Sequence, residues 1–196
     1  MESSNLSVNT IRLWSGRLFD LANPKPDQFC LEDIANALAK ICRFNGHVKK
    51  FYSVAEHSIH CLDHAIFSGL SVEAQIACLF HDATEAFVGD MVKPLKIMIP
   101  QYSEIETRIE KVIEEKFNID FTKTRRLVHD IDCSLLEAER SFLFDQKTSL
   151  FERLIVQPTV FKPDFKCFLP GEATTEFLDR AVNLLLSVGG ETLNGN

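Results

Sequence analysis

The sequence lacks features that would assign it at once to several classes of protein. Its six cysteines form no CxxC pair, so reduced thiols are favoured over a zinc ribbon or a disulfide framework. No apolar run approaches the roughly 20 residues that span a bilayer, so we expect no membrane partner. Basic residues are in deficit, with 21 Lys and Arg against 28 Asp and Glu. Because a nucleic-acid backbone normally binds a basic face, a nucleic-acid duplex is not a favoured partner, whereas a small anionic substrate stays open.

The composition is otherwise that of one globular domain. A chain of 196 residues, 45% of them hydrophobic, is long enough for one substantial core. The first ten residues, MESSNLSVNT, contain neither a basic nor an apolar segment, which predicts that they are not a secretion signal. We therefore expect a cytoplasmic protein.

Apolar residues recur with the 3.6-residue period of helices, and no alternating strand pattern is convincing. SVAE at 53–56 and SEIE at 103–106 fit the capping box that begins a helix. The sequence predicts an all-α fold, a single bundle of about six helices. We expect an irregular N-terminal arm at 1–30, a helical core at 31–188 and a disordered tail at 189–196. The expected helices are 31–44, 54–67, 71–88, 103–117, 122–145 and 174–188.

Three polar residues directly follow the apolar part of the third expected helix. In CLFHDATEAFVGD, at 78–90, they are His81, Asp82 and Glu85. Residues three or four positions apart share a helix face, so these side chains project toward a common side. A neutral imidazole and a carboxylate are good ligands for a first-row metal ion. A hydrogen-bonded helix end is the alternative explanation of the His-Asp pair by itself.

Two residues elsewhere strengthen the metal hypothesis. His57 lies in the second expected helix, directly after its capping box. Asp132 falls inside an apolar stripe on the long expected helix, where an unpaired buried carboxylate is costly. A cation or a positively charged side chain should therefore meet Asp132, and a structural ion pair with an arginine is the alternative. The stripe comprises Leu127, Val128, Ile131, Leu135, Leu136 and Phe142.

The order of these residues resembles the H…HD…D signature of HD-domain phosphohydrolases. HDATEAFVGDMVKPLK, at 81–96, is similar to a segment of the bacterial 5′-deoxynucleotidases, although Val92 stands where that pattern has a proline. GRLFDL at 16–21, DIANALAKICRFNGH at 33–47 and FYSVAEHS at 51–58 resemble phosphohydrolases that include the phage dATP triphosphohydrolases. The resemblance covers roughly residues 12–142, and the C-terminal third matches no motif of the family.

The resemblance implies a site for one divalent metal ion, whether Mn, Co, Zn, Fe, Ni or Mg. Glu85 would orient the attacking water or take its proton, the alternative being a solvated helix glutamate. Asp90, in the Gly-Asp turn, would lie near the leaving group or the sugar, the alternative being turn capping. The implied metal ligands are His57, His81, Asp82 and Asp132.

The same resemblance implies contacts with the substrate, to which the N-terminal arm would contribute. Trp14 could stack on a nucleobase or instead fix the arm to the domain. A phosphate needs cationic partners, and each candidate could equally be a solvated surface residue. The candidates are Arg17, Arg43, His47, Lys93 and Lys96.

The implied activity is metal-dependent hydrolysis of deoxynucleotides. The N-terminal segments favour a dATP-type triphosphohydrolase, which releases nucleoside and triphosphate. A 5′-deoxynucleotidase, which releases nucleoside and phosphate from a monophosphate, is the alternative. A catalytically silent nucleotide-binding HD module is a more distant alternative. The resemblance also implies a homo-oligomer, although no heptad or evident patch in the sequence supports a particular number of subunits.

Overall fold

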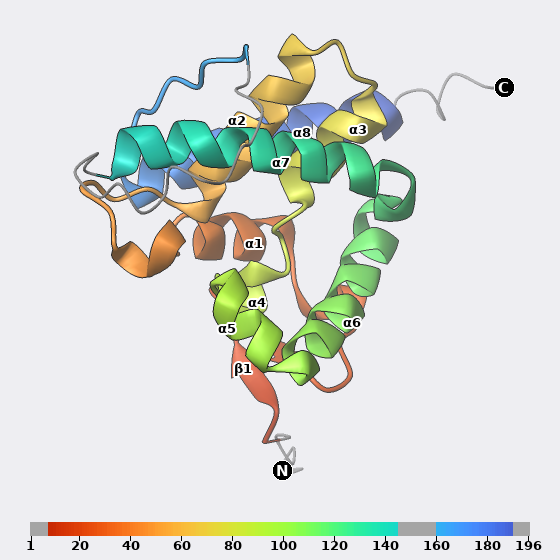
Figure 1. Ribbon diagram of the computed structural model, residues 1–196. Helices are drawn as coiled ribbons and strands as arrows, with labels where there is room; N and C mark the ends of the chain where they lie inside the picture. Colours follow the sequence, from red (N-terminus) through yellow and green to blue (C-terminus); the bar gives the residue numbers. More distant parts are fainter. Residues whose placement is uncertain (1–7, 145–159, 190–196) are drawn as a thin grey trace, which may run out of the picture.

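The computed structural model describes residues 8–144 and 160–189, which fold as a helical bundle (Figure 1). The expected all-α class is confirmed, and the sheet found within these ranges has only two short strands. Residues 1–7 of the expected arm and 190–196 of the expected tail lie outside the described residues. The strands are β1 Thr10–Arg12 and β2 Leu18–Asp20, 3₁₀ turns cover Pro26–Gln28 and Arg43–Gly46, and the helices are α1 Leu31–Leu38, α2 Val54–Phe67, α3 Val72–Phe80, α4 Glu85–Val88, α5 Lys93–Met98, α6 Pro100–Phe117, α7 Phe121–Leu143 and α8 Pro170–Gly189.

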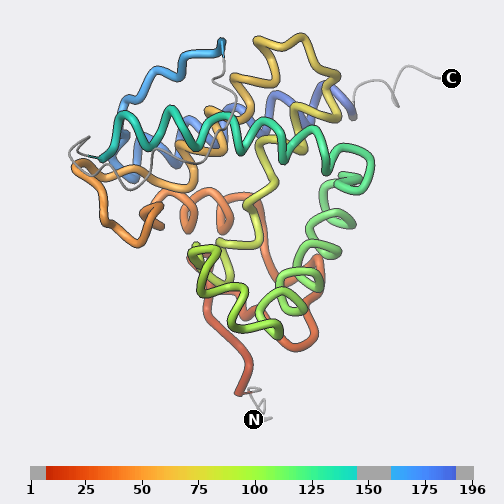
Figure 2. The backbone as a smooth tube through the Cα atoms, viewed as in Figure 1, coloured from red at the N-terminus to blue at the C-terminus, as the bar shows by residue number. Residues whose placement is uncertain are grey.

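Helices α2, α3, α7 and α8 form the main body of the bundle. α7 contacts both α2 and α3, while α8 contacts α1, α2 and α3 from the other side. Helices α5 and α6 lead away from this body toward the N-terminal hairpin, as the backbone trace shows (Figure 2). Fully buried side chains such as Leu62, Leu79 and Leu135 join the helices. Each such burial stabilises the fold by about 1.5–3 kcal/mol, because apolar surface is removed from water.

The N-terminal arm is less irregular than expected. β1 and β2 pair antiparallel, with Ile11 opposite Phe19. The ring of Phe19 is fully buried and stacks on Phe87 of α4, with ring centroids 4.1 Å apart. Aromatic burial thus holds the arm against the helix that follows the His-Asp pair. Strands of three residues are too short to give a recognisable period of two, so the sequence did not indicate them.

Helix α2 begins as expected but uses its first glutamate differently. Ser53 Oγ accepts the backbone N–H of Glu56 at 3.1 Å, which is the expected N-cap. The capping box also predicts that the Glu56 side chain accepts the backbone N–H of Ser53, and this prediction is wrong. The buried Glu56 carboxylate instead accepts the backbone N–H groups of Cys167 and Phe168 at 2.8 and 2.9 Å. Glu56 therefore ties the segment before α8 to the start of α2.

Two other helices begin or end at residues that differ from the expected ones, and each difference has a local cause. The capping box at 103–106 does not begin a helix, because α6 starts at Pro100, and proline is favoured in a first helical turn. The first expected helix ends at Leu38 instead of reaching residue 44. Residues 41–43 run antiparallel to 52–54, and the backbone N–H of Arg43 donates to the carbonyl of Tyr52 at 2.9 Å. This pairing brings Arg43 beside the start of α2.

The third expected helix is interrupted where its polar residues begin. α3 ends at Phe80, residues 81–84 form a turn, and the short α4 follows. Gly89, with φ of 84°, ends α4 in a conformation that glycine adopts readily. His81 and Asp82 therefore stand at the end of a buried apolar helix, which explains why polar residues follow a core segment so abruptly.

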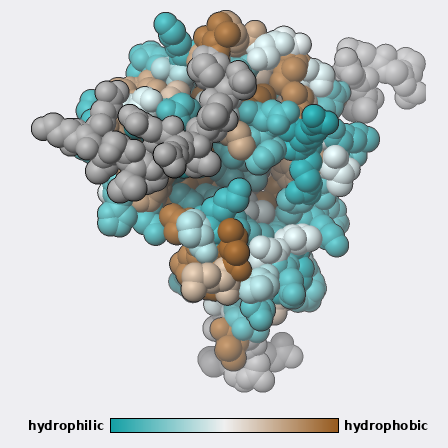
Figure 3. All heavy atoms as spheres, viewed as in Figure 1, coloured by the Kyte–Doolittle hydropathy of each residue, from teal (hydrophilic) through white to brown (hydrophobic). Residues whose placement is uncertain are grey.

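The surface carries a local apolar region over α5. Figure 3 shows hydrophobic atoms gathered in the lower part of the molecule, and the residues Ile97 and Met98 are 71% and 77% exposed. Across the ranges 8–144 and 160–189, none of the helices combines the length and the apolar character needed to cross a membrane.

Candidate metal centre

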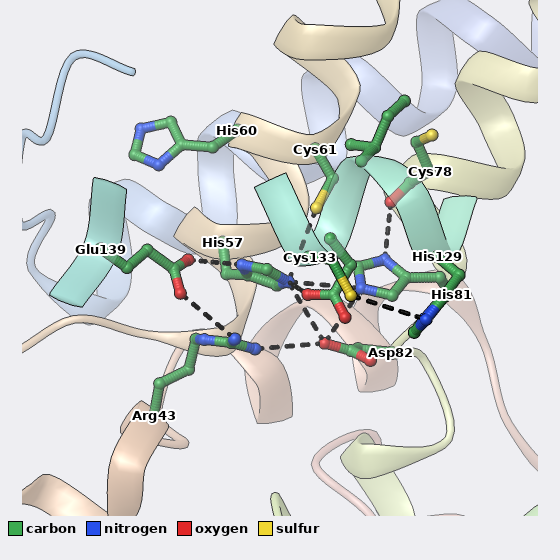
Figure 4. A network of polar contacts seen from close by, with 12 residues as sticks. Arg43, His57, His60, Cys61, Cys78, His81, Asp82, His129, Cys133 and Glu139 are labelled. Carbon is green, nitrogen blue, oxygen red and sulfur yellow. Dashed lines mark hydrogen bonds and ion pairs between the residues drawn. The ribbon is translucent and has the colours of Figure 1, made fainter. Parts of the chain in front are cut away.

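The four residues expected to bind metal converge, although they come from three separate segments of the chain. His57 belongs to α2, His81 and Asp82 follow α3, and Asp132 belongs to α7. His57 Nε2 lies 3.3 Å from His81 Nε2, 3.2 Å from Asp132 Oδ1 and 3.6 Å from Asp82 Oδ2. His81 Nε2 lies 3.2 Å from Asp82 Oδ2. We call these four residues the His–Asp cluster, most of which is drawn in Figure 4.

The other nitrogen of each imidazole is held by an acceptor outside the cluster. His57 Nδ1 lies 2.5 Å from Glu139 Oε1, and His81 Nδ1 lies 2.8 Å from the carbonyl oxygen of Cys78. A carbonyl oxygen only accepts, so His81 carries its proton on Nδ1. A carboxylate on the Nδ1 side of His57 favours the same tautomer. In their neutral form, which is the form that binds a metal ion, both imidazoles then present the lone pair of Nε2 to the middle of the cluster.

The spacing of the donor atoms fits a single ion. Nitrogen and oxygen ligands lie about 2.0–2.2 Å from a first-row ion, so neighbouring ligands on one ion lie about 2.8–3.6 Å apart. The separations of 3.2–3.6 Å within the cluster match this range. Two imidazoles and two carboxylates are also a donor set that binds divalent ions such as Zn²⁺, Mn²⁺ or Fe²⁺. The residues present therefore fit a divalent cation.

A thiol adjoins the cluster. Cys61 lies one helical turn after His57 on α2 and is fully buried. Its Sγ is 3.5 Å from His57 Nε2, and the ligand atoms of His57, Cys61 and His81 all lie within 4.8 Å of one another. Burial raises the pKa of the Cys61 thiol to about 11, although the positive His57 imidazole opposes this shift. This group of two histidines and one cysteine can hold a metal ion.

Both carboxylates of the cluster are held in their anionic form. Burial by itself would raise the pKa of Asp82, but the imidazoles of His81 and His57 and the guanidinium of Arg43 lower it below its usual range. Asp132 is similar, since burial raises its pKa while its hydrogen bond to His57 and the charge of His57 lower the pKa to about 2. Anionic oxygens are the form in which carboxylates bind cations.

A buried polar network supports His57 from behind. Glu139 of α7 is fully buried and accepts from the Tyr52 hydroxyl at 2.9 Å. Arg43 bridges the network and the cluster, with Nη2 3.3 Å from Glu139 Oε2 and Nη1 3.4 Å from Asp82 Oδ2. Burial raises the pKa of Glu139, but the charges of Arg43 and His57 outweigh this and lower it to about 2. The arginine ion pair that was the alternative explanation of Asp132 is therefore formed by Glu139 instead.

Charged groups of the His–Asp cluster affect the pKa values of Glu85 and Asp90. Glu85 is only 7% exposed, and its Oε2 has no hydrogen-bond partner among the described residues. Burial, followed by the negative charges of Asp82 and Asp90, raises the pKa of Glu85 well above its usual value. Burial also raises the pKa of Asp90, partly offset by Arg43. Glu85 is therefore not the solvated helix glutamate that was its alternative explanation.

A cavity of about 180 Å³ opens beside the cluster between α6 and α7. His81 and Asp132 form part of its lining, and the side chain of Asp132 is 36% exposed. The apolar stripe indicates a buried position for Asp132, whereas the residue is partly exposed at the edge of the buried face. The remaining lining residues of this α6–α7 cavity are Glu110, Phe121, Arg125, Val128 and His129.

The expected substrate contacts are placed less uniformly. Arg43 belongs to the network described above, with a side chain only 12% exposed. Lys96 forms an ion pair with Glu106 at 2.8 Å and lies over the ring of Tyr102. Trp14 is 64% exposed. The others are exposed to solvent, and their binding roles stay predictions: they are Arg17, His47 and Lys93.

Sequence reasoning missed two residues that support the site, Cys61 and Tyr52. Cys61 was interpreted as a structural thiol, although its spacing of four from His57 was visible and places both on one helix face. The position of Glu139 in the same apolar stripe as Asp132 predicts a pairing with a buried arginine, which its ion pair with Arg43 confirms. Tyr52 carried no signal, because its contact with Glu139 joins residues 87 positions apart.

These features define a helical protein with a buried group of histidines and a cysteine that can hold a metal ion, which is compatible with an HD-type domain. No protein-family model matches the sequence. The chain is 33% identical over 173 residues to the uncharacterized protein YfdR of Escherichia coli, which covers 88% of this chain and 94% of YfdR. The chain therefore belongs to the same family as YfdR. An uncharacterized protein of Rhodobacter capsulatus is 37% identical over 115 residues, 55% of this chain and 58% of that protein.

Proposed function

We propose that this protein is a metal-dependent HD-domain phosphohydrolase that acts on deoxynucleotides. The observation that carries the proposal is the convergence on His57 Nε2 of the second imidazole and of two carboxylates, each at 3.2–3.6 Å, beside a cavity. A divalent cation bound by such donors lowers the pKa of water and polarises a phosphoryl group. Hydrolysis of a phosphate ester is the reaction that needs both effects at one place.

The positions of these residues suggest a separate role for each in the proposed reaction. His57, His81, Asp82 and Asp132 hold the cation, and Glu139 keeps His57 in the tautomer that presents Nε2. Glu85, buried and with an unpaired carboxylate oxygen, is the candidate to orient the attacking water or exchange a proton with it.

The favoured substrate is a deoxynucleoside triphosphate of the dATP type, cleaved between the 5′ oxygen and the α-phosphorus. The sequence segments that resemble the triphosphohydrolases support this choice. One structural observation supports the alternative, a 5′-deoxynucleotidase. The α6–α7 cavity of about 180 Å³ is smaller than the roughly 300–1,000 Å³ typical of ligand pockets, which suits a compact monophosphate.

Product analysis tests the proposal directly. The full-length protein is incubated with single nucleotides and with Mn²⁺, Co²⁺ or Mg²⁺, and the products are separated. Free triphosphate together with nucleoside identifies a triphosphohydrolase, whereas orthophosphate from monophosphates alone identifies a nucleotidase. Nucleotide binding without turnover in any metal would refute the enzymatic proposal and select a silent binding module.

A variant pair tests the ligand assignment. Asp132→Ala should abolish both metal retention and turnover, because the carboxylate lies 3.2 Å from His57 Nε2. Asp130→Ala removes an exposed carboxylate from the same helix and should leave both unchanged. Metal content is measured by elemental analysis after desalting. An Asp132→Ala protein that retains one equivalent of metal would contradict the assignment.

A further inference from the structure

One sulfur atom lies beside the candidate metal centre, so its chemistry differs from that of a site with only nitrogen and oxygen ligands. Cys61 is fully buried, and its Sγ is directed at His57 Nε2 from 3.5 Å (Figure 4). Sulfur and nitrogen bonded to the same ion lie about 2.3 and 2.1 Å from it, which separates them from each other by about 3–3.6 Å. The observed separation therefore fits two ligands of one ion.

The helix itself favours this pairing. His57 and Cys61 are four residues apart on α2, so their side chains lie on one face. The same spacing joins the two histidines of helical zinc sites, where one face presents both ligands to the ion. The third member of the group, His81, comes from the end of α3, and one of its ring nitrogens is within 4.8 Å of Sγ. Two segments thus present nitrogen and sulfur donors to one point.

We infer that Cys61 is a thiolate ligand of this centre and that it makes the centre selective for a thiophilic ion, Zn²⁺, Co²⁺ or Cd²⁺, over Mg²⁺. The inference rests on the proposed metal centre. When the ion binds, the S–H bond of Cys61 breaks, a sulfur–metal bond forms, and the proton passes to solvent. Soft thiolates select such ions, whereas carboxylates alone suit Mg²⁺ and Mn²⁺.

Cobalt spectroscopy tests the inference without any assay of activity. The full-length protein is stripped of metal with a chelator under reducing conditions and is then titrated with Co²⁺ in the absence of oxygen. A thiolate bound to Co²⁺ gives a charge-transfer absorption band in the near ultraviolet, which nitrogen and oxygen ligands do not give. We expect this band to grow to saturation at one equivalent of Co²⁺.

Serine variants identify the cysteine whose sulfur binds the Co²⁺ ion and gives the band. Cys61→Ser should lose the band and bind Cd²⁺ more weakly, with no loss of Mg²⁺ affinity. Cys133→Ser is the matched control, because Cys133 also lies one turn from a histidine, with Sγ 3.6 Å from His129 Nε2, and beside Asp132. This control should keep the band. Far-ultraviolet circular dichroism verifies that both variants are folded.

Several results would overturn the inference: no near-ultraviolet band with wild-type protein, no Co²⁺ binding at all, or a band that persists in folded Cys61→Ser. The wild-type spectrum decides by itself if that variant does not fold. Nucleotide hydrolysis is measured on the same samples. A band without hydrolysis supports Cys61 as a metal ligand and rejects the proposed phosphohydrolase activity. Hydrolysis without a band supports the activity and rejects Cys61 as a ligand.

Discussion

Glu139 offers the sharpest test of how the site is held together. Its carboxylate is fully buried and meets three donors, His57 Nδ1, the Tyr52 hydroxyl and the Arg43 guanidinium. Glu139→Ala would leave all three donors without this acceptor and would leave Arg43 with less compensation for its charge. Glu139→Gln keeps the shape and one acceptor oxygen but removes the negative charge.

The expected magnitude follows from the burial of the pair. Removing one partner of a buried ion pair costs about 3–5 kcal/mol, because the remaining charge cannot be solvated. Domains of this size are stable by only about 5–15 kcal/mol, so Glu139→Ala should remove a large part of the total. With a urea m-value of about 2 kcal/mol/M, a loss of about 4 kcal/mol lowers the unfolding midpoint by about 2 M. Glu139→Gln should cost less.

Urea unfolding followed by circular dichroism measures this loss. Glu137→Ala, on the same helix and outside the network, is the control and should change the midpoint little. The folded pKa of Glu139 is lowered to about 2, below the ordinary value of about 4.3. Its charge therefore stabilises the fold above about pH 4.3, and this contribution disappears as the pH falls toward 2. A Glu139→Ala protein as stable as the Glu137→Ala control at neutral pH would refute the reasoning.

Three further outcomes are expected. Asp33→Asn should cost about 1–3 kcal/mol in urea unfolding, because the buried carboxylate accepts both the N–H and the hydroxyl of Ser15. Burial raises the pKa of Asp33, but hydrogen bonds with Cys30 and Ser15 outweigh this and lower it, so the cost should shrink below about pH 3.9, and an unchanged difference there would contradict the assignment. Ser53→Ala should cost about 0.5–2 kcal/mol by removing the cap on the Glu56 N–H, and a shift below about 0.3 kcal/mol would refute the role of the cap. Phe87→Ala should cost about 3–5 kcal/mol and make the N-terminal arm sensitive to limited proteolysis, and an arm that stays resistant would show that the ring does not anchor it.

The sequence predicted those parts of the site that can be recognised from neighbouring residues, and it did not predict contacts between distant residues. His57 and the His81-Asp82 pair stand beside helix starts and ends that can be recognised from a few neighbouring residues, so their segments were identified correctly. Glu56 was misassigned, because its carboxylate binds backbone groups about 110 residues away, at 167 and 168, which no capping pattern can indicate. The substrate contact of Arg43 stays a prediction, and its ion pairs with Asp82 and Glu139 could not be read from the sequence because they join distant segments.

The sequence by itself determined the helical class, the break after Phe67, the N-caps at Ser53 and Ser71 and the polar residues after α3, because each depends on side chains within a few positions of one another. Only the tertiary structure decided which groups surround His57. Packing of α7 against α2 brings residues some 80 positions apart into contact, with Glu139 on one ring nitrogen and Asp132 near the other. Periodicity specifies which face of a helix is apolar, but not which side chain of another helix that face meets.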